Sequence, residues 1–487
     1  MDALRFGIQT DPINSLLTLA LVTLSFVLIR KLFAAKDSLL TYLLGMAFVA
    51  SASVSIQLSY RFMSPIFGLA LFLSVAAAYG VIRIKNDIRA AAWGTVCLAL
   101  SLGLYQANLG CFCVILLVYF LLLLFQQADR RLVHAYIGRS LGSAAAGMGL
   151  YYLILKLILL ATGWQLSEYN GAADVSPLHI LKQLPVGIAR AYQIFGAYFF
   201  RNQYRNNILQ AVGFFVLVVL LIGIGLLARL GRVVQSRNLE YALLSAAALA
   251  VLPAACNVML LITGSAVWRL QMAGALDLFL PLCILLLDAT RREKTQAKRW
   301  RTIMAGGVTL LAFLIVYGNV YMRSVDQEAM SEGRKALKTM SDRIADDLID
   351  FGYFDGEEQL PVVFVGRPSS NPTFVMREYY LYANTYAEMG RFWGGADVAR
   401  QVWKSVFQNI TPINLTYGWV DRYLDVYAES ETAQMPNYPQ EGYIRQIGDT
   451  VVVKISDDYN DSISAEEEDT PLAGYFELGQ VDNNFYE

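Results

Sequence analysis

Residues 109–139 read LGCFCVILLVYFLLLLFQQADRRLVHAYIGR, an uncharged apolar run followed at once by Arg130, Arg131 and Arg139. A helix needs about 20 apolar residues to cross a hydrocarbon core of roughly 30 Å. Similar runs recur along the chain, and the short run at 91–104 is retained because dropping it would put the next basic connection on the wrong side. We therefore expect about ten transmembrane helices, at 13–34, 38–58, 64–84, 91–104, 109–125, 138–163, 208–230, 241–262, 267–289 and 302–321.

Basic residues gather on alternate connections between these runs. The connections after the first, third, fifth, seventh and ninth runs hold 18 Lys and Arg, whereas the other connections and the N-terminal segment hold seven. Cytoplasmic connections of membrane proteins carry the excess of Lys and Arg. The pattern predicts a multi-pass protein of the cytoplasmic (inner) membrane, with both termini extracytoplasmic.

Composition and charge divide the chain into two parts. Hydrophobic residues make up 56% of it, and the polar first twelve residues give no sign of a cleavable signal peptide. Residues 1–321 hold 26 basic and 11 acidic residues, a net charge of +15, whereas 322–487 hold 13 and 29, a net charge of −16. We expect a helical membrane domain at 1–321 with an outer loop at 162–207, and an extracytoplasmic domain at 322–456.

The C-terminal part has the pattern of a small α/β domain. A polar helix is expected at about 323–351, buried strands at 360–365 and 451–455, and helices near 375–389, 396–408 and 418–428. Residues 457–487 are acidic, weakly patterned and read as disordered. All five cysteines lie in candidate spans, so disulfide bonds do not hold the outer domain together. We interpret Cys111 and Cys113 as packing residues, with a metal site as the alternative.

Acidic residues are scarce in the membrane part, and one falls near the middle of a predicted span. Asp277 lies within the run 267–289. A charge inside a membrane is costly, so an acid there is a functional candidate by default. The other interpretation is that Asp277 stays protonated and hydrogen-bonds a neighbouring helix, and the sequence does not choose between the two.

Polar and aromatic residues collect in the connections expected on the outer face. Guanidinium groups there suit a phosphate, and aromatic faces with amide donors suit a sugar. The alternative is an interfacial belt of Trp and Tyr with snorkelling Arg. A helical spacing of apolar residues over 177–200 further predicts a helix that either lies flat on the outer leaflet or covers the helix bundle. The candidate donor- or acceptor-binding residues are Tyr60, Arg61, Tyr105, Gln106, Arg190, Arg201 and Arg269.

Three segments carry a resemblance to a known family: QLSYRFMSPIFGLALFLSVAAAYG (57–80), YQANLG (105–110) and MPNYPQEGYIRQIGDTVVVKIS (435–456). Together they resemble the GtrII-like O-antigen glucosyltransferases, over about residues 5–456. The resemblance implies a multi-span GT-C fold. It also implies transfer of glucose from a polyprenyl-phosphate donor to a surface polysaccharide or a lipid-linked glycan, on the outer side of the membrane.

Two departures from the family pattern affect the expected chemistry. Members usually have an additional N-terminal span followed by an outer loop with catalytic acids, and this chain starts too late to contain either. The family often has Asp after its Tyr-Arg-Phe triplet, where this sequence has Met63. The matched positions Tyr60, Arg61, Tyr105 and Gln106 are carried over as site residues of unassigned role.

A glycosyl transfer needs a carboxylate to accept the acceptor's proton and cations to stabilise the departing phosphate. Asp11 is the best remaining catalytic base, although Asp before Pro12 is also a good helix start. Arg61 and Arg269 are the leading phosphate ligands. No metal cluster and no cofactor motif is visible, because His134 and His179 are assigned to opposite sides of the membrane.

The competing classes are a transporter or flippase of lipid-linked sugars and an inactive membrane scaffold. A transporter is expected to show paired half-repeats with Gly or Pro breaks in matching spans. No such repeat is visible, and the polar residues cluster at one face, which favours an enzyme. The expected partners are the lipid-linked donor, the glycan acceptor and membrane lipids, with no nucleic acid.

The topology is tested by a reporter that is active only in the cytoplasm, fused after Glu487. The fusion should stay silent, because the excess of basic residues places the C-terminus outside. The same reporter fused within the connection after the third run should be active. A strong signal from the C-terminal fusion would overturn the predicted orientation.

Overall fold

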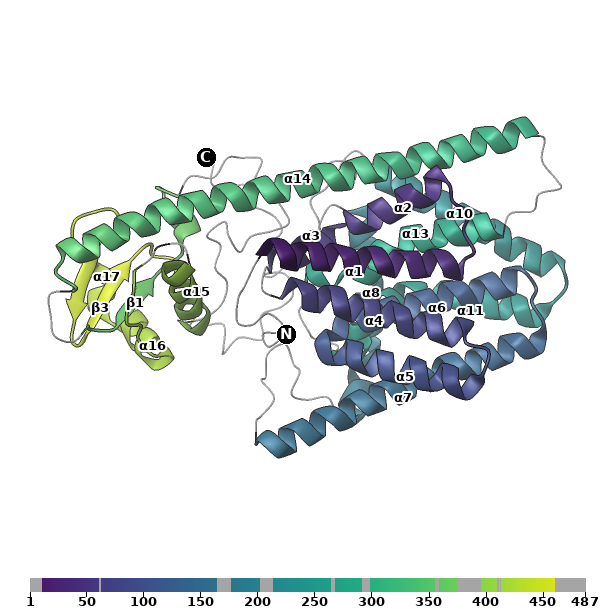
Figure 1. Ribbon diagram of the computed structural model, residues 1–487, viewed down its shortest axis with the longest axis horizontal. Coiled ribbons are helices and arrows are strands. Elements are labelled where there is room, and N and C mark those ends of the chain that lie inside the picture. Colours follow the sequence, from purple (N-terminus) through teal and green to yellow (C-terminus); the bar gives the residue numbers. More distant parts are fainter. Residues whose placement is uncertain are drawn as a thin grey trace. The chain divides into compact units, whose positions relative to one another are not determined.

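The computed structural model describes residues 11–60, 63–163, 177–201, 213–263, 268–290, 298–354, 359–374, 396–409, 411 and 413–459. The chain divides into two compact units, Met1–Arg323 and Ser324–Glu487, whose elements are labelled in Figure 1. Arg61, the expected helix at 375–389 and residues 460–487 of the expected acidic tail lie outside the described residues.

The first unit is built from apolar helices joined by short connections. Among the described residues, eight helices are long and apolar enough to cross a membrane, or nine if the bent pair α2 and α3 forms one span. The elements are α1 (Asp11–Leu32), α2 (Leu39–Val49), α3 (Ala52–Ser59), α4 (Ser64–Arg83), α5 (Asp87–Leu104), η2 (Gln106–Asn108), α6 (Leu109–Phe125), α7 (Arg130–Thr162), α8 (Pro177–Phe200), α10 (Phe214–Gln235), α11 (Leu239–Cys256), α12 (Val258–Thr263), η4 (Leu270–Met272), α13 (Gly274–Ala289) and the first part of α14 (Lys298–Asp350).

Three of the ten predicted runs differ from a single long helix. The run 241–262 is divided at Asn257 into α11 and α12. The run 38–58 breaks into α2 and α3, which are bent by 40° at residues 50–51. Ser51 has an extended backbone there, and the local sequence ASAS is rich in Ser, which offers the backbone competing hydrogen bonds. The run 267–289 begins with the short turn η4, so that α13 has only 16 residues.

The helix expected at 177–200 is confirmed, because α8 has these bounds. Its packing against α12 is close. A Cβ atom added to Gly187 would lie 2.2 Å from the Leu260 carbonyl oxygen, so only glycine permits this approach.

Arginines of the basic connections hydrogen-bond to the ends of neighbouring helices. Arg83, the last residue of α4, donates to the carbonyl oxygens of Lys31 and, at 3.2 Å, Leu32 at the end of α1. Arg139 of α7 donates to the Ile84 carbonyl oxygen at 3.2 Å, just after α4. The last carbonyls of a helix have no partner within it, and a cation is favoured there by the helix dipole.

The remaining basic connections join the same layer. Arg229 of α10 donates to the Leu287 carbonyl oxygen at 3.1 Å, near the end of α13. Glu240, at the start of α11, pairs with Arg130 at 2.7 Å and His134 at 2.8 Å. The described parts of the five basic connections therefore lie at one end of the first unit, as the alternation of basic residues along the sequence requires.

The five cysteines lie in helices of the first unit and are free thiols. Four of them are buried, and Cys113 is partly buried. Among the residues that the structure describes, no group of three His, Cys, Asp or Glu side chains is arranged to hold a metal ion. Cys111 belongs to the buried apolar cluster of the first unit, and Cys113 packs against this cluster.

The second unit contains a three-stranded sheet in the order β1-β3-β2. The predicted strands at 360–365 and 451–455 are confirmed as β1 (Val362–Val365) and β3 (Thr450–Lys454), which pair in parallel. The sequence did not predict β2 (Ile444–Ile447), which pairs antiparallel with β3 after a short turn at Gly448. The described helices here are the second part of α14, α15 (Ala396–Asn409), α16 (Val420–Ala428) and α17 (Ser430–Gln434).

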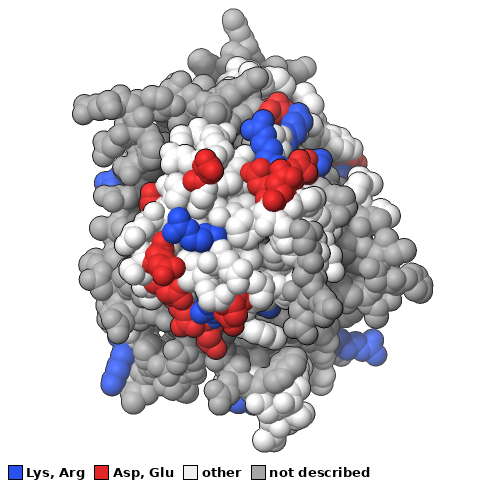
Figure 2. All heavy atoms as spheres, turned by 90° about the vertical axis from the view of Figure 1, so that its left-hand side faces the viewer, with Lys and Arg blue, Asp and Glu red and all other residues white. Residues whose placement is uncertain are grey.

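Apolar residues cover both faces of this sheet. On one face Phe364 stacks on Trp403 with ring centroids 4.5 Å apart, and Ile344 of α14 joins the same cluster. On the other face Tyr423 and Val452 belong to a second buried cluster. Figure 2 shows one face of the molecule, on which carboxylate side chains lie in several places with some basic side chains beside them.

A buried lysine ties the end of the sheet to α17. Lys454 is 1% exposed, and its Nζ donates to the carbonyl oxygens of Ala433 (3.1 Å) and Met435 (2.9 Å). It also pairs with Asp457 at 2.7 Å. A hydrogen bond from Lys454 lowers the pKa of Asp457, and a hydrogen bond from Asn437 adds a smaller effect in the same direction.

A fragment of residues 322–459 should melt cooperatively, and Lys454→Met should lower its free energy of unfolding by about 1–3 kcal/mol, because two buried carbonyls lose their donor. At this size each kcal/mol lowers Tm by roughly 3 °C. The difference in unfolding free energy between the unmutated fragment and Lys454→Met should become smaller as the pH is lowered from 7 to 3. A carboxylate with a depressed pKa stabilises the fold above its unfolded pKa of about 4, and this contribution is lost as pH falls through the folded pKa.

The matched control is Lys404→Met, since Lys404 is exposed on α15. It should leave Tm within about 1 °C, the small effect usual for surface changes. Equal Tm values for the two variants would show that the Lys454 hydrogen bonds add no stability.

Candidate functional site

The predicted site residues lie mainly in connections at the helix ends opposite the basic layer. Tyr60 follows α3, Tyr105 follows α5, and Arg269 precedes η4. The helices α5 and α6, which begin or end at this site, have 18 and 17 residues, so they separate it from the basic layer by about 25 Å at 1.5 Å per residue.

Two of these residues meet around a phenylalanine that the sequence analysis did not select. Phe67 of α4 packs edge-on against Tyr60, with ring centroids 6.0 Å apart, and against Tyr105, at 4.8 Å. Edge-to-face contacts of this kind stabilise aromatic pairs beyond their buried area. The connection after α3 and the connection after α5 are thereby brought together.

Arg269 and Gln271 approach Tyr105 from the other side. Burial raises the pKa of the Tyr105 hydroxyl, and the neighbouring Tyr60 raises it further. The Gln271 side chain and the charge of Arg269 have the opposite, smaller effect. Gln271 is itself anchored, because the Gln57 side-chain amide donates to its backbone oxygen at 2.9 Å. The structure therefore brings together Tyr60, Tyr105 and Arg269.

Polar atoms in this region are buried without a hydrogen-bond partner among the described residues. They are the Tyr105 hydroxyl, Gln271 Oε1 and Asn108 Nδ2. Asn108 lies in the turn that follows Tyr105 and is 3% exposed. Most buried polar groups in proteins are hydrogen-bonded, so each exception needs an explanation. We call Tyr105, Asn108, Arg269 and Gln271 the Tyr105 group; its donors and acceptors match the hydroxyl groups of a sugar, and its cation matches a phosphate.

Asp277 lies in the first turn of α13, nearer to the helix start than the predicted run implied. Its Oδ2 accepts a hydrogen bond from the Ser53 backbone N–H at 3.0 Å, and its Oδ1 accepts one from the Tyr198 hydroxyl. Ser53 is in the first turn of α3, and Tyr198 is a buried residue of α8. The Asp277 side chain thus hydrogen-bonds two neighbouring helices, α3 and α8.

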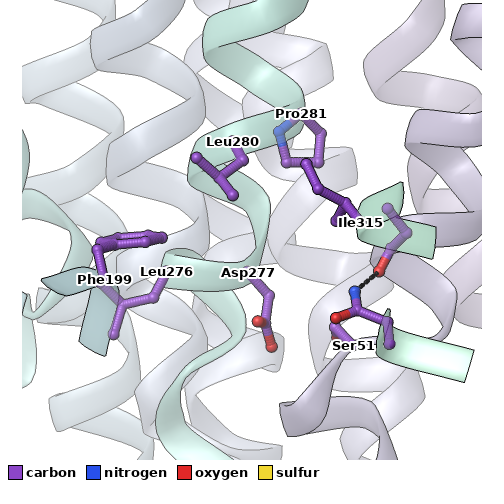
Figure 3. Close-up of a pocket in the computed structure, with 9 residues that line it drawn as sticks. Ser51, Phe199, Leu276, Asp277, Leu280, Pro281 and Ile315 are labelled. Carbon is purple, nitrogen blue, oxygen red and sulfur yellow. Dashed lines mark hydrogen bonds between the residues drawn. The ribbon is translucent and has the colours of Figure 1, made fainter. Parts of the chain in front are cut away.

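A small cavity of about 20 Å³ lies beside Asp277, which is enough for one water molecule. Figure 3 shows the Asp277 side chain between Phe199 and Ser51. Asn319 of α14 also lines the cavity, and its side-chain amide donates to the Ala47 carbonyl oxygen at 2.8 Å. A cavity this small has no room for a sugar, so substrate does not bind there in this conformation.

The other predicted residues have different surroundings. Gln106 is exposed and donates to the Tyr151 hydroxyl on α7. Arg190 is buried within α8, and Arg201 is exposed just after this helix ends. Asp11 is the first residue of α1, and its side chain, like Arg61, is outside the description.

Sequence reasoning did not select Gln57, Asn108 and Gln271 for the site. The signal for Asn108 was its place in the YQANLG turn, three residues after Tyr105. Nothing in the sequence relates Gln57 to Gln271, because 214 positions separate them.

Comparisons with known proteins place the chain in a family. No curated protein and no solved structure matches it. The family model described as Glucosyl transferase GtrII matches residues 3–276, which is more than half of the chain and includes the whole Tyr105 group. The chain belongs to the GtrII glucosyl transferase family.

Proposed function

We propose that this protein is a GT-C-type membrane glucosyltransferase that moves glucose from a polyprenyl-phosphate donor to a surface polysaccharide or lipid-linked glycan, at the outer face of the cytoplasmic membrane. The observation that carries the proposal is the Tyr105 group, whose unpartnered polar atoms lie beside Arg269. Membership of the GtrII family supports glucosyl transfer as the reaction.

The charge distribution supports this location. The basic connections form one layer, and the positive-inside rule assigns that layer to the cytoplasm. The Tyr105 group is at the opposite helix ends, which supports an outward-facing site. A lipid-linked donor suits this place, because its phosphate lies at the membrane surface while its chain stays among the lipids.

Different side chains are proposed to bind the phosphate and the sugar of the donor. The Arg269 guanidinium offers a planar pair of donors to a phosphate. Arg61, which follows Tyr60 in the sequence, is proposed as a second phosphate ligand. The amides of Asn108 and Gln271 and the hydroxyl of Tyr105 suit the hydroxyl groups of the sugar. Tyr60 and Phe67 supply apolar ring surface beside them.

The reaction requires one proton transfer and one exchange of bonds at the sugar. A carboxylate accepts the proton of the acceptor hydroxyl. At the same time the oxygen of that hydroxyl forms a bond to the anomeric carbon of the sugar. The bond between that carbon and the phosphate oxygen breaks, and the phosphate leaves with the electron pair, stabilised by guanidinium groups. We assign the proton acceptor to Asp11, because both oxygens of Asp277 accept hydrogen bonds from the protein.

Substitution of Arg269 tests the phosphate site. Arg269→Lys should impair transfer because an ammonium cannot copy the bidentate geometry, and Arg269→Ala should impair it more. Loss of a hydrogen bond to a charged group costs about 1.5–3 kcal/mol, roughly a tenfold to hundredfold effect on transfer. The measurement is transfer of labelled glucose from a polyprenyl-phosphate donor in membranes with matched protein levels.

Arg131→Ala is the matched control, because Arg131 is exposed at the basic end. It should leave transfer unchanged. Unchanged transfer by both Arg269 variants would make Arg269 an interfacial anchor. Absence of transfer by the unmutated chain would refute the proposed activity itself.

Tyr105→Phe separates binding from folding. The Tyr105 hydroxyl makes no hydrogen bond of good geometry among the described residues, and the Gln271 side chain lies beside it. Its removal should therefore change thermal stability little. Transfer should still fall about fivefold, the effect of losing a hydrogen bond of about 1 kcal/mol to the donor. A loss of stability with normal transfer per folded molecule would place the hydroxyl in the fold rather than in the site.

A further inference from the structure

We propose that Asp277 is a positioning residue, whose carboxylate holds α3 against α13 and so sets the geometry of the Tyr105 group. This inference rests on the proposed function for its kinetic consequence, and on the hydrogen bonds alone for its structural one. Asp277 is 8% exposed and lies in none of the segments that carry the family resemblance.

The helix α3 begins anew after the bend at residues 50–51, so its first N–H groups have no partner within the helix. Its N-cap residue, Ser51, makes no side-chain capping hydrogen bond. The Ser53 N–H is satisfied by Asp277, which lies 224 positions further along the chain. The break in the helix and the buried carboxylate therefore depend on each other.

A second bond joins the same two segments one helical turn further along α3. Gln57 donates to the backbone oxygen of Gln271, six residues before Asp277. Two attachment points, at Ser53 and Gln57, fix both the rotation and the height of α3 relative to η4. With only one of them, α3 could rotate about it, and Tyr60 at its end would lose its alignment.

The other oxygen of Asp277 extends this arrangement to α8. It accepts from Tyr198, whose side chain is fully buried and whose ring lies edge-on to Trp268 with centroids 6.4 Å apart. Trp268 directly precedes Arg269. The carboxylate thus connects the starts of α3 and α13 with a helix that contacts the segment carrying Arg269.

The chemistry of the carboxylate gives variants that separate positioning from catalysis. In Asp277→Asn, the amide oxygen still accepts from the Ser53 N–H, and the amide nitrogen donates to the Tyr198 oxygen, because a hydroxyl both donates and accepts. Asp277→Leu has a similar size and makes neither bond. A positioning role therefore tolerates Asn, whereas proton transfer to the carboxylate does not.

Steady-state transfer kinetics provide the first measurement, with polyprenyl-phosphate glucose as the varied substrate. Asp277→Leu should raise KM roughly tenfold with a much smaller change in kcat, because the binding residues are displaced. Asp277→Asn should stay within about threefold of the unmutated enzyme, and Tyr198→Phe should fall between the two. Asp288→Leu, at the exposed far end of α13, is the control and should change nothing.

Two kinetic outcomes would overturn the proposal. Equal losses in Asp277→Asn and Asp277→Leu would mean that the charge itself acts in the reaction. A lower kcat per molecule with unchanged KM in Asp277→Leu would mean a loss of folded enzyme without displacement of the site.

Hydrogen–deuterium exchange of the full chain in detergent decides the structural link without any activity. Amides of residues 51–60 should exchange faster in Asp277→Leu than in the unmutated chain, whereas those of α5 should not. Unchanged exchange at residues 51–60 in Asp277→Leu would refute the structural link even if the unmutated chain transfers glucose normally. If the unmutated chain transfers no glucose, the proposed function fails, and faster exchange at 51–60 would still support the positioning role.

Discussion

Unpaired backbone groups at helix ends are the constraint on which the first unit depends. In an apolar environment each unsatisfied N–H or C=O group costs several kcal/mol. Side chains remote in sequence meet this requirement at both ends of the bundle. Arg83, Arg139 and Arg229 donate to the last carbonyls of neighbouring helices, and Asp277 accepts from the first turn of α3. These bonds determine which helix ends are neighbours and therefore which connections can form a common site.

Much of the helical architecture could be predicted from the sequence, because apolar length and charge are local properties. The runs at 64–84 and 109–125 match α4 and α6 closely, and the basic connections do share one end. The bend between α2 and α3 was not predicted, because the Ser residues at 51–59 are interspersed with apolar residues and leave the run long enough to read as one span. Strand β2 was also missed, because Ile444–Ile447 has only two apolar residues and owes its conformation to pairing with β3.

The candidate site was predictable in composition but not in arrangement. Tyr60, Tyr105 and Arg269 stood out because each lies in a tight connection on the expected outer side, and the structure brings them together. Gln106, from the same YQANLG turn, instead bonds to Tyr151. The two differ because adjacent residues after a helix point in different directions, and a sequence motif does not record which direction faces the neighbouring connection.

The distribution of cysteines has a consequence for chemical labelling. All five native thiols lie in helices of the first unit, and four are buried there, whereas the sequence after residue 323 contains none. Thiolate formation and reagent access both decrease in buried apolar surroundings. One cysteine introduced at an exposed position such as Lys404 would therefore carry a spectroscopic probe with little competition from the native thiols. The second unit can be followed by fluorescence or spin resonance in the intact chain without a cysteine-free background.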